Sequence, residues 1–219
     1  MARSTQRAAI NQRVRQREER RRRFVATAQA LFLRHGYAGT SVNAVVREAG
    51  GSLATLYAEF GTKEGLFEAV MRERVGDAFG AAGTADSGDV ATRLMRLARR
   101  IHERTLSPDS LGLYRLAIAE GPRLRALRQA VLDAGLDAFL SQLATLFARW
   151  SRAGDLAIDD AGLAARQFLA LVQGQHQFIA GCGGARRIPV NERRQHLVAA
   201  VEAFLRLYGA GEATIRPKA

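Results

Sequence analysis

The stretch that most constrains the fold of this chain runs from Thr40 to Lys63, where adjacent glycines separate two short amphipathic segments. Gly50 and Gly51 can adopt the positive φ angles that a sharp turn requires. Two short helices joined by such a turn are typical of a helix-turn-helix, whose second helix enters the major groove of DNA. Before the glycines, apolar residues recur at the spacing of one helix face, at Val42, Val45, Val46 and Ala49.

Both short helices have candidate N-caps. Thr40 or Ser41 can cap the first helix, and Ser52 can cap the second by accepting an amide hydrogen bond. Within the second helix, Leu56 and Phe60 are spaced to point inward. The side chains left on or near its outer face are Ser52, Leu53, Thr55 and Tyr57.

The residues around this turn resemble the DNA-binding domain of the TetR family of repressors. The resemblance covers roughly residues 20–75 and rests on Gly50-Gly51-Ser52, Thr55-Leu56-Tyr57, Phe60, Lys63-Glu64 and Leu66. A helix-turn-helix pattern alone is a weak signal, but the adjoining TLYxxFxxKExL pattern is a specific one. The rest of the chain resembles the family only in its length and in being all helix. The resemblance implies a homodimer, a palindromic operator and a small-molecule effector.

The chain departs from the family pattern at several positions. Val46 stands where alanine is usual and Gly51 where valine is usual. We expect the larger side chain to offset the smaller one; the alternative is a looser turn. Leu53 and Ala54 replace a basic residue and a glycine, which favours apolar base reading toward thymine methyl groups. Glu59 should weaken DNA binding unless it faces away or accepts a hydrogen bond from cytosine.

Positive charge is concentrated at the N-terminus. The formal net charge is +12, and residues 1–23 hold nine arginines against Glu18 and Glu19, whereas residues 24–76 carry no net charge. This distribution favours an acidic polymer such as DNA as partner. Arg20 to Arg23 and the preceding arm are therefore expected to contact phosphates or the minor groove, as homeodomain arms do. The alternative is a solvated, disordered basic tail.

Two further phosphate contacts are expected near the turn. The hydroxyl of Tyr57 can donate to a phosphate, and Lys63 is expected to contact one by resemblance to the family. The complete set of residues expected to bind double-stranded DNA is Arg22, Arg23, Thr40, Ser41, Ser52, Leu53, Ala54, Thr55, Tyr57 and Lys63.

Helical periodicity without β-alternation predicts an all-α protein of about nine helices. We expect an N-terminal three-helix helix-turn-helix domain followed by a larger helical ligand-binding and dimerisation domain. The first helix should begin at about Asn11, and the longest periodic stretch covers residues 123–152. The expected divisions are a disordered basic arm (1–15), the helix-turn-helix domain (16–75), the ligand-binding and dimerisation domain (76–210) and a tail (211–219).

The last two helices are apolar on more than one side, which exceeds what one core contact requires. They lie centrally, or they pair with a second copy in a four-helix interface, as the family resemblance favours. A twofold dimer would place two recognition helices on the two halves of a palindrome. The expected interface residues are Phe168, Val172, His176, Leu197, Val201 and Phe204.

By the same resemblance, the middle helices should enclose a pocket for a small hydrophobic effector of unknown identity. An aromatic stripe at helical spacing is equally typical of plain core, and His102 and His176 fit satisfied core histidines. The candidate lining residues are Phe79, Met95, His102, Tyr114, Phe139, Leu143, Phe147, Trp150 and Gln173.

Other functional classes find little support. Cys182 and His176 lack an orienting acid and an oxyanion motif, so we expect no enzyme. The four histidines and one cysteine show no metal-ligand spacing, and no metal or other cofactor is expected. A single cysteine fits a reducing cytoplasm. No apolar run approaches the ~18 residues of a membrane span, and no signal peptide is evident, so we expect a cytoplasmic protein without a membrane partner.

The sequence therefore predicts a ligand-responsive, TetR-like repressor that blocks polymerase sterically until an effector releases it. Two alternatives remain. One is a nonspecific architectural DNA-binding protein driven by the arginine head, whose affinity would fall with salt equally on every sequence. The other is a helical carrier of hydrophobic ligands with a vestigial helix-turn-helix, which would be insensitive to loss of Tyr57 and Lys63.

Overall fold

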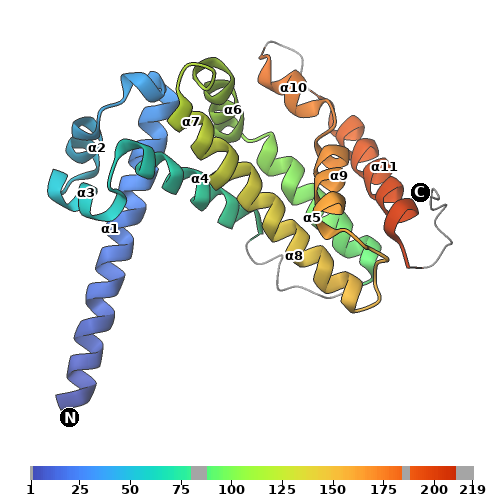
Figure 1. Ribbon diagram of the computed structural model, residues 1–219, viewed down its shortest axis with the longest axis horizontal. Helices are drawn as coiled ribbons and strands as arrows, with labels where there is room; N and C mark the ends of the chain where they lie inside the picture. Colours follow the sequence, from blue (N-terminus) through green and yellow to red (C-terminus); the bar gives the residue numbers. More distant parts are fainter. Residues whose placement is uncertain (1, 80–87, 184–187, 211–219) are drawn as a thin grey trace. The chain divides into compact units, whose positions relative to one another are not determined.

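The computed structural model describes residues 2–79, 88–183 and 188–210. Within these ranges the chain is all helix, and the β-type pairing consists of one isolated bridge between Leu156 and Gly209. The all-α prediction is confirmed (Figure 1). The helices are α1 (Ala2–Gly39), α2 (Val42–Ala49), α3 (Leu53–Phe60), α4 (Lys63–Phe79), α5 (Val90–Thr105), α6 (Pro108–Glu120), α7 (Arg125–Gln129), a π-helical segment (Ala130–Asp137), α8 (Ala138–Arg152), α9 (Ala161–Gln173), α10 (His176–Gly181) and α11 (Val190–Tyr208).

The chain forms two compact units, each built from two separate segments. The first unit comprises residues 1–73 and 116–134, and the second comprises residues 74–115 and 135–219. The end of α6 and the whole of α7 thus cluster with the helix-turn-helix, which the proposed domain boundary at residue 75 did not anticipate. The proposed tail, 211–219, lies outside the described residues.

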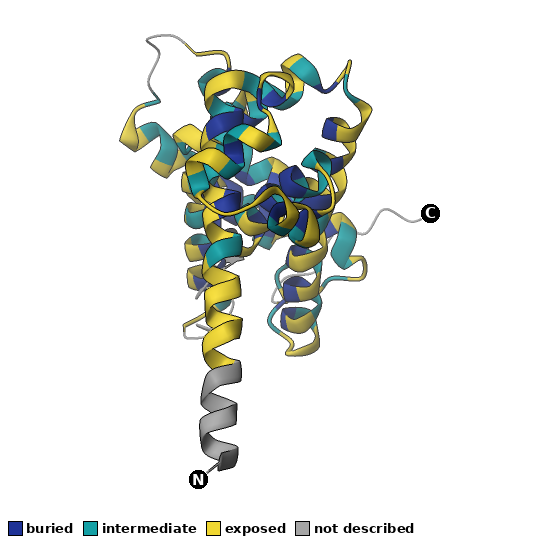
Figure 2. Cartoon of the chain, turned by 90° about the vertical axis from the view of Figure 1, so that its left-hand side faces the viewer, coloured by how far each residue is buried: buried dark blue, intermediate teal, exposed yellow. Residues whose placement is uncertain are grey.

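The helix α1 begins at Ala2, earlier than the expected start near Asn11. Its residues from 11 to 19 are exposed on every side, which Figure 2 shows as a yellow stretch of helix. Arginine, glutamine, alanine and glutamate all have favourable helix propensity, so this segment can be helical without packing against a core. The segment expected to be a disordered arm therefore lies on the same helix that braces the helix-turn-helix.

An aromatic core holds the first unit together. The ring of Phe32 on α1 packs edge-on against Phe67 on α4, with centroids 5.2 Å apart, and Phe24 meets Phe60 of α3 at 6.2 Å. Phe24 also explains the unusual Gly51, because its Cζ atom lies 3.0 Å from where a Cβ of residue 51 would stand. The φ of +119° at Gly51 also favours glycine there.

The second unit is organised around α5, α8, α9 and α11, which lie side by side in Figure 1. Its centre is a cluster of fully buried rings in which Phe147 of α8 lies 5.3 Å from Phe168 of α9 and 5.1 Å from Phe204 of α11. The longest periodic stretch, residues 123–152, contains the π-helical segment. The helices α9 and α10 are separated by a break at Gly174, whose φ is +49°.

The stretch Arg125–Arg152 is long and apolar enough, by length and composition alone, to cross a membrane. The sequence-based expectation considered uninterrupted apolar runs, and none is long enough to span a membrane. The mean hydropathy of a window can still be high when a few polar residues interrupt the run. The α8 part of this stretch buries Leu143, Leu146, Phe147 and Trp150 in the core of the second unit. A core helix of a soluble protein passes the same test of length and composition, and one such helix is weak evidence for a membrane span.

Candidate nucleic-acid interface

Both helices of the turn are capped by serine side chains. The Oγ atom of Ser41 accepts the amide of Ala44 at 3.1 Å, and the Oγ atom of Ser52 accepts the amide of Thr55 at 3.1 Å. Between them, Gly50 and Gly51 have φ values of +73° and +119°. The capping and turn chemistry expected from the sequence is therefore present, and it sets where α3 begins.

The helix α3 is anchored on one side and open on the other. Leu56 has no exposed surface and Phe60 is 9% exposed, so both point into the first unit. On the opposite side Leu53 is 38% exposed and Tyr57 is 47% exposed, and Ser52 and Ala54 are exposed as well. Thr55 is half-buried, and its hydroxyl lies 2.9 Å from the Oγ atom of Ser52. The outer face predicted for α3 is accessible to a groove.

Thr40 is buried and does not form part of the surface, whereas the phosphate contact of Lys63 stays a prediction. Thr40 is only 3% exposed, and its hydroxyl donates to the carbonyl of Gly36 at 2.8 Å, so it belongs to the turn rather than to the surface. The ammonium of Lys63 lies 4.4 Å from the ring centroid of Tyr37 and 3.5 Å from the carbonyl of Ala38. Burial lowers the pKa of Lys63. Both side chains stabilise the connection between α1 and α2.

The acidic residue on α3 is neutralised within the chain. The guanidinium of Arg17 on α1 donates to both carboxylate oxygens of Glu59, at 2.5 Å and 3.2 Å. One turn further along, Arg21 lies 5.0 Å from the ring centroid of Phe60. Arg17 was not among the residues predicted to bind DNA, although the recurrence of arginine at positions 13, 17 and 21 places these residues on one helix face.

Arg22 and Arg23 are exposed but do not lie on the α1 face that contacts α3. Successive residues of an α-helix are rotated by about 100°, so these two side chains point to other sides of α1 than Arg17 and Arg21. They line a shallow groove along α1 together with Gln16, Glu19 and Arg20. Their phosphate contacts stay a prediction, whereas Arg17 and Arg21 contact residues of α3.

Replacing Arg17 with alanine is expected to lower affinity for an operator duplex by roughly fivefold, because it leaves the Glu59 carboxylate uncompensated near the phosphates. The double variant Arg17→Ala/Glu59→Gln should recover most of that loss, since the carboxylate is then absent. Fluorescence anisotropy on a labelled duplex at fixed salt measures both effects. A double variant no better than Arg17→Ala would mean that Arg17 itself contacts DNA.

The six residues expected at a dimer interface are buried inside the single chain. Phe168, Val172 and Phe204 have no exposed surface, and the largest exposed fraction in the set is 6%, at Leu197. That assignment is therefore wrong, because the most apolar faces of α9 and α11 are the ones that form the core. The exposed residues of these helices include Leu163, Arg166 and Ala170 on α9 and Arg194, Val198, Ala199 and Glu202 on α11.

The expected pocket residues divide into two groups. Leu143, Phe147 and Trp150 belong to the core cluster, and the guanidinium of Arg93 lies 4.9 Å from the Trp150 ring. The half-buried residues are Met95, Tyr114, Phe139 and Gln173, of which Met95 lines a groove on the outer side of α5. The side chain of Phe79 lies outside the described residues. The effector pocket and its lining therefore stay a prediction.

His102 belongs to a cluster of three histidine rings in the second unit. Its Nε2 atom lies 2.9 Å from Nδ1 of His176, and the ring of His196 lies 4.4 Å from that of His176. The Nε2 atom of His196 donates to the carbonyl of Val172 at 3.0 Å, since a carbonyl only accepts. The cluster confirms the interpretation of His102 and His176 as hydrogen-bonded core histidines, and it was not evident from their spacing in the sequence.

Acidification is expected to destabilise the second unit through His102. Burial, followed by the neighbouring His176 and His196, lowers the pKa of His102 to about 4 from 6.5. The unfolded chain therefore binds a proton below pH ~6.5 that the folded chain does not, so the free energy of unfolding falls between about pH 6.5 and pH 4, by at most ~3 kcal/mol. Urea unfolding at several pH values measures this slope.

The variant His102→Gln is expected to flatten the pH dependence in that window, because its amide can keep the hydrogen bond but does not titrate. His35→Gln provides the matched control, since His35 is exposed on α1. If the free energy of unfolding depends on pH equally in wild type and His102→Gln, groups other than His102 dominate the acid sensitivity.

Comparison with known proteins matches both units. Residues 92–210 match the C-terminal domain of AefR-like transcriptional repressors, and residues 24–70 match the bacterial regulatory proteins of the tetR family. The HTH-type transcriptional repressor ComR of Escherichia coli (strain K12) is 50% identical over 54 residues, a match that spans only 25% of this chain and 25% of ComR.

Solved structures extend the similarity to most of the chain. A TetR-family transcriptional regulator from Mesorhizobium loti MAFF303099 is 28% identical with a TM-score of 0.73, covering 88% of this chain and 98% of its own. The flavonoid-responsive regulator FrrA is 25% identical with a TM-score of 0.67, covering 89% and 100%. With a capped helix-turn-helix and more than half of its length matched by one family domain, the chain belongs to the TetR family of transcriptional regulators.

Proposed function

We propose that this TetR-family regulator is a repressor that binds a palindromic operator as a homodimer and leaves it when a small hydrophobic effector binds. One observation carries the proposal. The helix α3 is capped by Ser52 and anchored by the buried Leu56 and Phe60, yet it keeps Leu53 and Tyr57 exposed. Such a helix can enter a major groove without loss of its packing.

The chemistry of α3 suggests how it would read DNA. Leu53 and Ala54 offer apolar contacts suited to thymine methyl groups, and the hydroxyl of Tyr57 can donate to a phosphate. The carboxylate of Glu59 is already paired with Arg17. Exposed arginines of α1 would supply the remaining phosphate neutralisation, so affinity should fall steeply with salt.

The second copy would pack on the outward faces of α9 and α11. These faces combine the exposed Leu163 and Val198 with small side chains at Ala170 and Ala199, and charged residues flank them. Small residues allow helices to approach closely, and family membership supports a twofold pairing of this kind. Two recognition helices about one DNA turn apart would then cover a palindrome and exclude polymerase.

An effector would act on the second unit. The effector would release the protein from DNA if it bound the conformation that cannot bind the operator more tightly than the conformation that can. A difference of a few kcal/mol in binding free energy is sufficient. FrrA is a flavonoid-responsive regulator, so planar aromatic compounds are the first class to test. We expect the protein to act in the cytoplasm as a DNA-binding regulator rather than an enzyme, and without a cofactor.

Selection of bound fragments from a genomic library, followed by footprinting, tests the proposal. The expected result is a palindromic site whose affinity exceeds that of a scrambled duplex by at least about 10³-fold at 0.15 M salt. Equal salt-dependent affinity for both duplexes would favour the architectural alternative, and no binding to either would favour the carrier.

Titration of flavonoids into the operator complex then tests release. Val198→Glu should shift sedimentation toward the monomer.

A further inference from the structure

A break in α1 lies directly before the helix-turn-helix. Gly36 has φ +76° and ψ 169°, so the helical ladder is interrupted there although the helix resumes up to Gly39. Such a break removes the intrahelical carbonyl partners of the following amides. The residues concerned are Tyr37 and Ala38, which precede Thr40 and Ser41, the N-cap of α2.

One carboxylate from a distant part of the sequence satisfies both amides. The Oε1 atom of Glu120 accepts the amide of Tyr37 at 3.0 Å, and its Oε2 atom accepts the amide of Ala38 at 2.9 Å. Glu120 is the last residue of α6 and belongs to the first unit with the helix-turn-helix. Charge-assisted bonds of this kind are about twice as strong as neutral ones.

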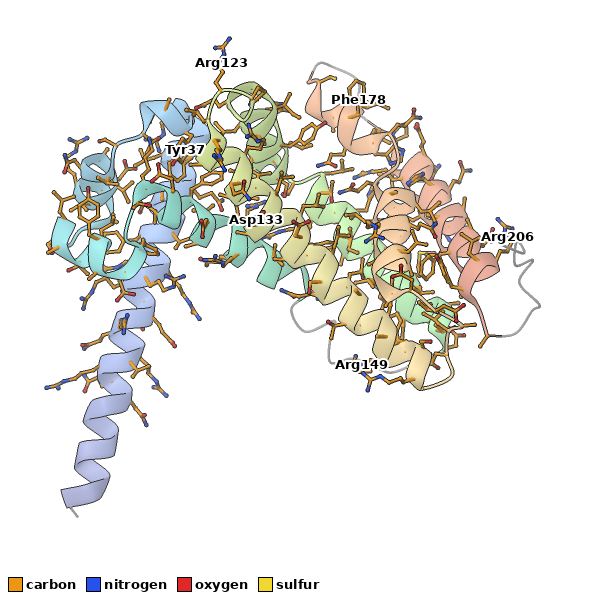
Figure 3. All side chains as sticks on the ribbon, viewed as in Figure 1. Tyr37, Arg123, Asp133, Arg149, Phe178 and Arg206 are labelled. Atoms are coloured by element: carbon orange, nitrogen blue, oxygen red, sulfur yellow. The ribbon has the colours of Figure 1, made fainter. Side chains whose placement is uncertain are left out.

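The carboxylate of Glu120 lies directly against the backbone of Gly36. A Cβ atom at residue 36 would stand 2.6 Å from Oε1 of Glu120, and the positive φ there also favours glycine. At the next residue, the ammonium group of Lys63 packs over the ring of Tyr37. This tyrosine is 6% exposed and lies inside the first unit (Figure 3). Thr40 donates to the carbonyl of Gly36 and completes the turn.

We propose that Glu120 is a positioning residue for DNA binding. Its carboxylate holds the Gly36–Thr40 turn and thereby sets the direction in which α2 and α3 leave α1. The proposal rests on the DNA-binding function proposed above and assigns to the end of α6 a role in orienting the recognition helix. Glu120 itself touches no DNA, so its loss would act through the placement of α3.

The test compares full-length wild type with Glu120→Gln, which preserves volume but turns an amide group toward a backbone N–H. Hydrogen exchange of peptides covering residues 33–42 and operator affinity are measured on the same samples. Exchange of the Tyr37 and Ala38 amides is expected to accelerate by about tenfold or more, and operator affinity to fall by about tenfold. Glu120→Asp, which keeps the charge with a shorter reach, should give intermediate values for both.

Glu103→Gln is the matched control, since Glu103 is exposed on α5 in the second unit, and it should change neither measurement. Unchanged exchange at Tyr37 and Ala38 in Glu120→Gln would overturn the proposal. Faster exchange with wild-type operator affinity would also overturn it, because the contact would then be structural only. If wild type itself bound no operator, the proposed function would fail, whereas the exchange result would still report on the carboxylate contact.

Discussion

Replacing Phe147 with alanine is expected to lower the free energy of unfolding of the second unit by about 3–5 kcal/mol. Phe147 has no exposed surface, and its ring contacts Trp150, Phe168 and Phe204 with centroid distances of 6.0, 5.3 and 5.1 Å. The substitution removes these contacts and leaves a cavity among α8, α9 and α11. Because these helices also pack against one another, they can relax only partly into the cavity. Chemical denaturation followed by circular dichroism measures the loss.

The matched control is Phe178→Ala. Phe178 is 65% exposed and projects from α10 (Figure 3), so its removal should change the unfolding free energy by no more than about 0.5 kcal/mol. The experiment also separates two roles of Phe147. A loss below about 1 kcal/mol would indicate that the ring lines a preformed effector pocket, as the sequence suggested, rather than the close-packed core.

Replacing Tyr57 with alanine is expected to weaken operator binding by about 100-fold, while the fold remains intact. Tyr57 is 47% exposed on the outer face of α3, and the neighbouring Leu56 and Phe60 anchor that helix without it. A hydrogen bond to a charged group contributes about 1.5–3 kcal/mol, and roughly 3 kcal/mol corresponds to a hundredfold change in affinity. Electrophoretic mobility shift on the selected operator measures the change.

Tyr57→Phe separates the hydroxyl from the ring. If the hydroxyl donates to a phosphate, this variant should lose about tenfold or more in affinity on every sequence, whereas loss confined to particular operator positions would indicate base contact instead. Phe178→Ala again serves as control, because it removes an exposed aromatic ring outside the first unit. Wild-type affinity in Tyr57→Ala would exclude α3 as the recognition helix.

Much of the helix-turn-helix could be predicted because its determinants are local. Serine caps, adjacent glycines and the inward spacing of Leu56 and Phe60 act within a few residues of one another, and each has the expected geometry. The all-α class followed from helical periodicity for the same reason. Start and end points were less certain, as the early start of α1 at Ala2 shows.

The direction of an apolar face could not be predicted from periodicity. Phe168, Val172 and Phe204 form a strong apolar stripe, but a stripe has the same spacing whether it faces the core of its own chain or a second copy. The structure shows that these three residues are buried in the second unit, so their side of the helices faces the core of the chain itself. Phe147 was assigned to a pocket on similarly ambiguous grounds.

The sequence by itself determined the family, the capped turn and the exposed reading face of α3, because short-range spacing and capping decide them. Only the tertiary structure decided the partners of single charged groups. Glu59 pairs with Arg17, 42 positions away, and Glu120 binds the amide of Tyr37, 83 positions away. Such pairings depend on which helices the fold brings together in space. A pattern of neighbouring residues does not specify which distant residue each charged group will meet.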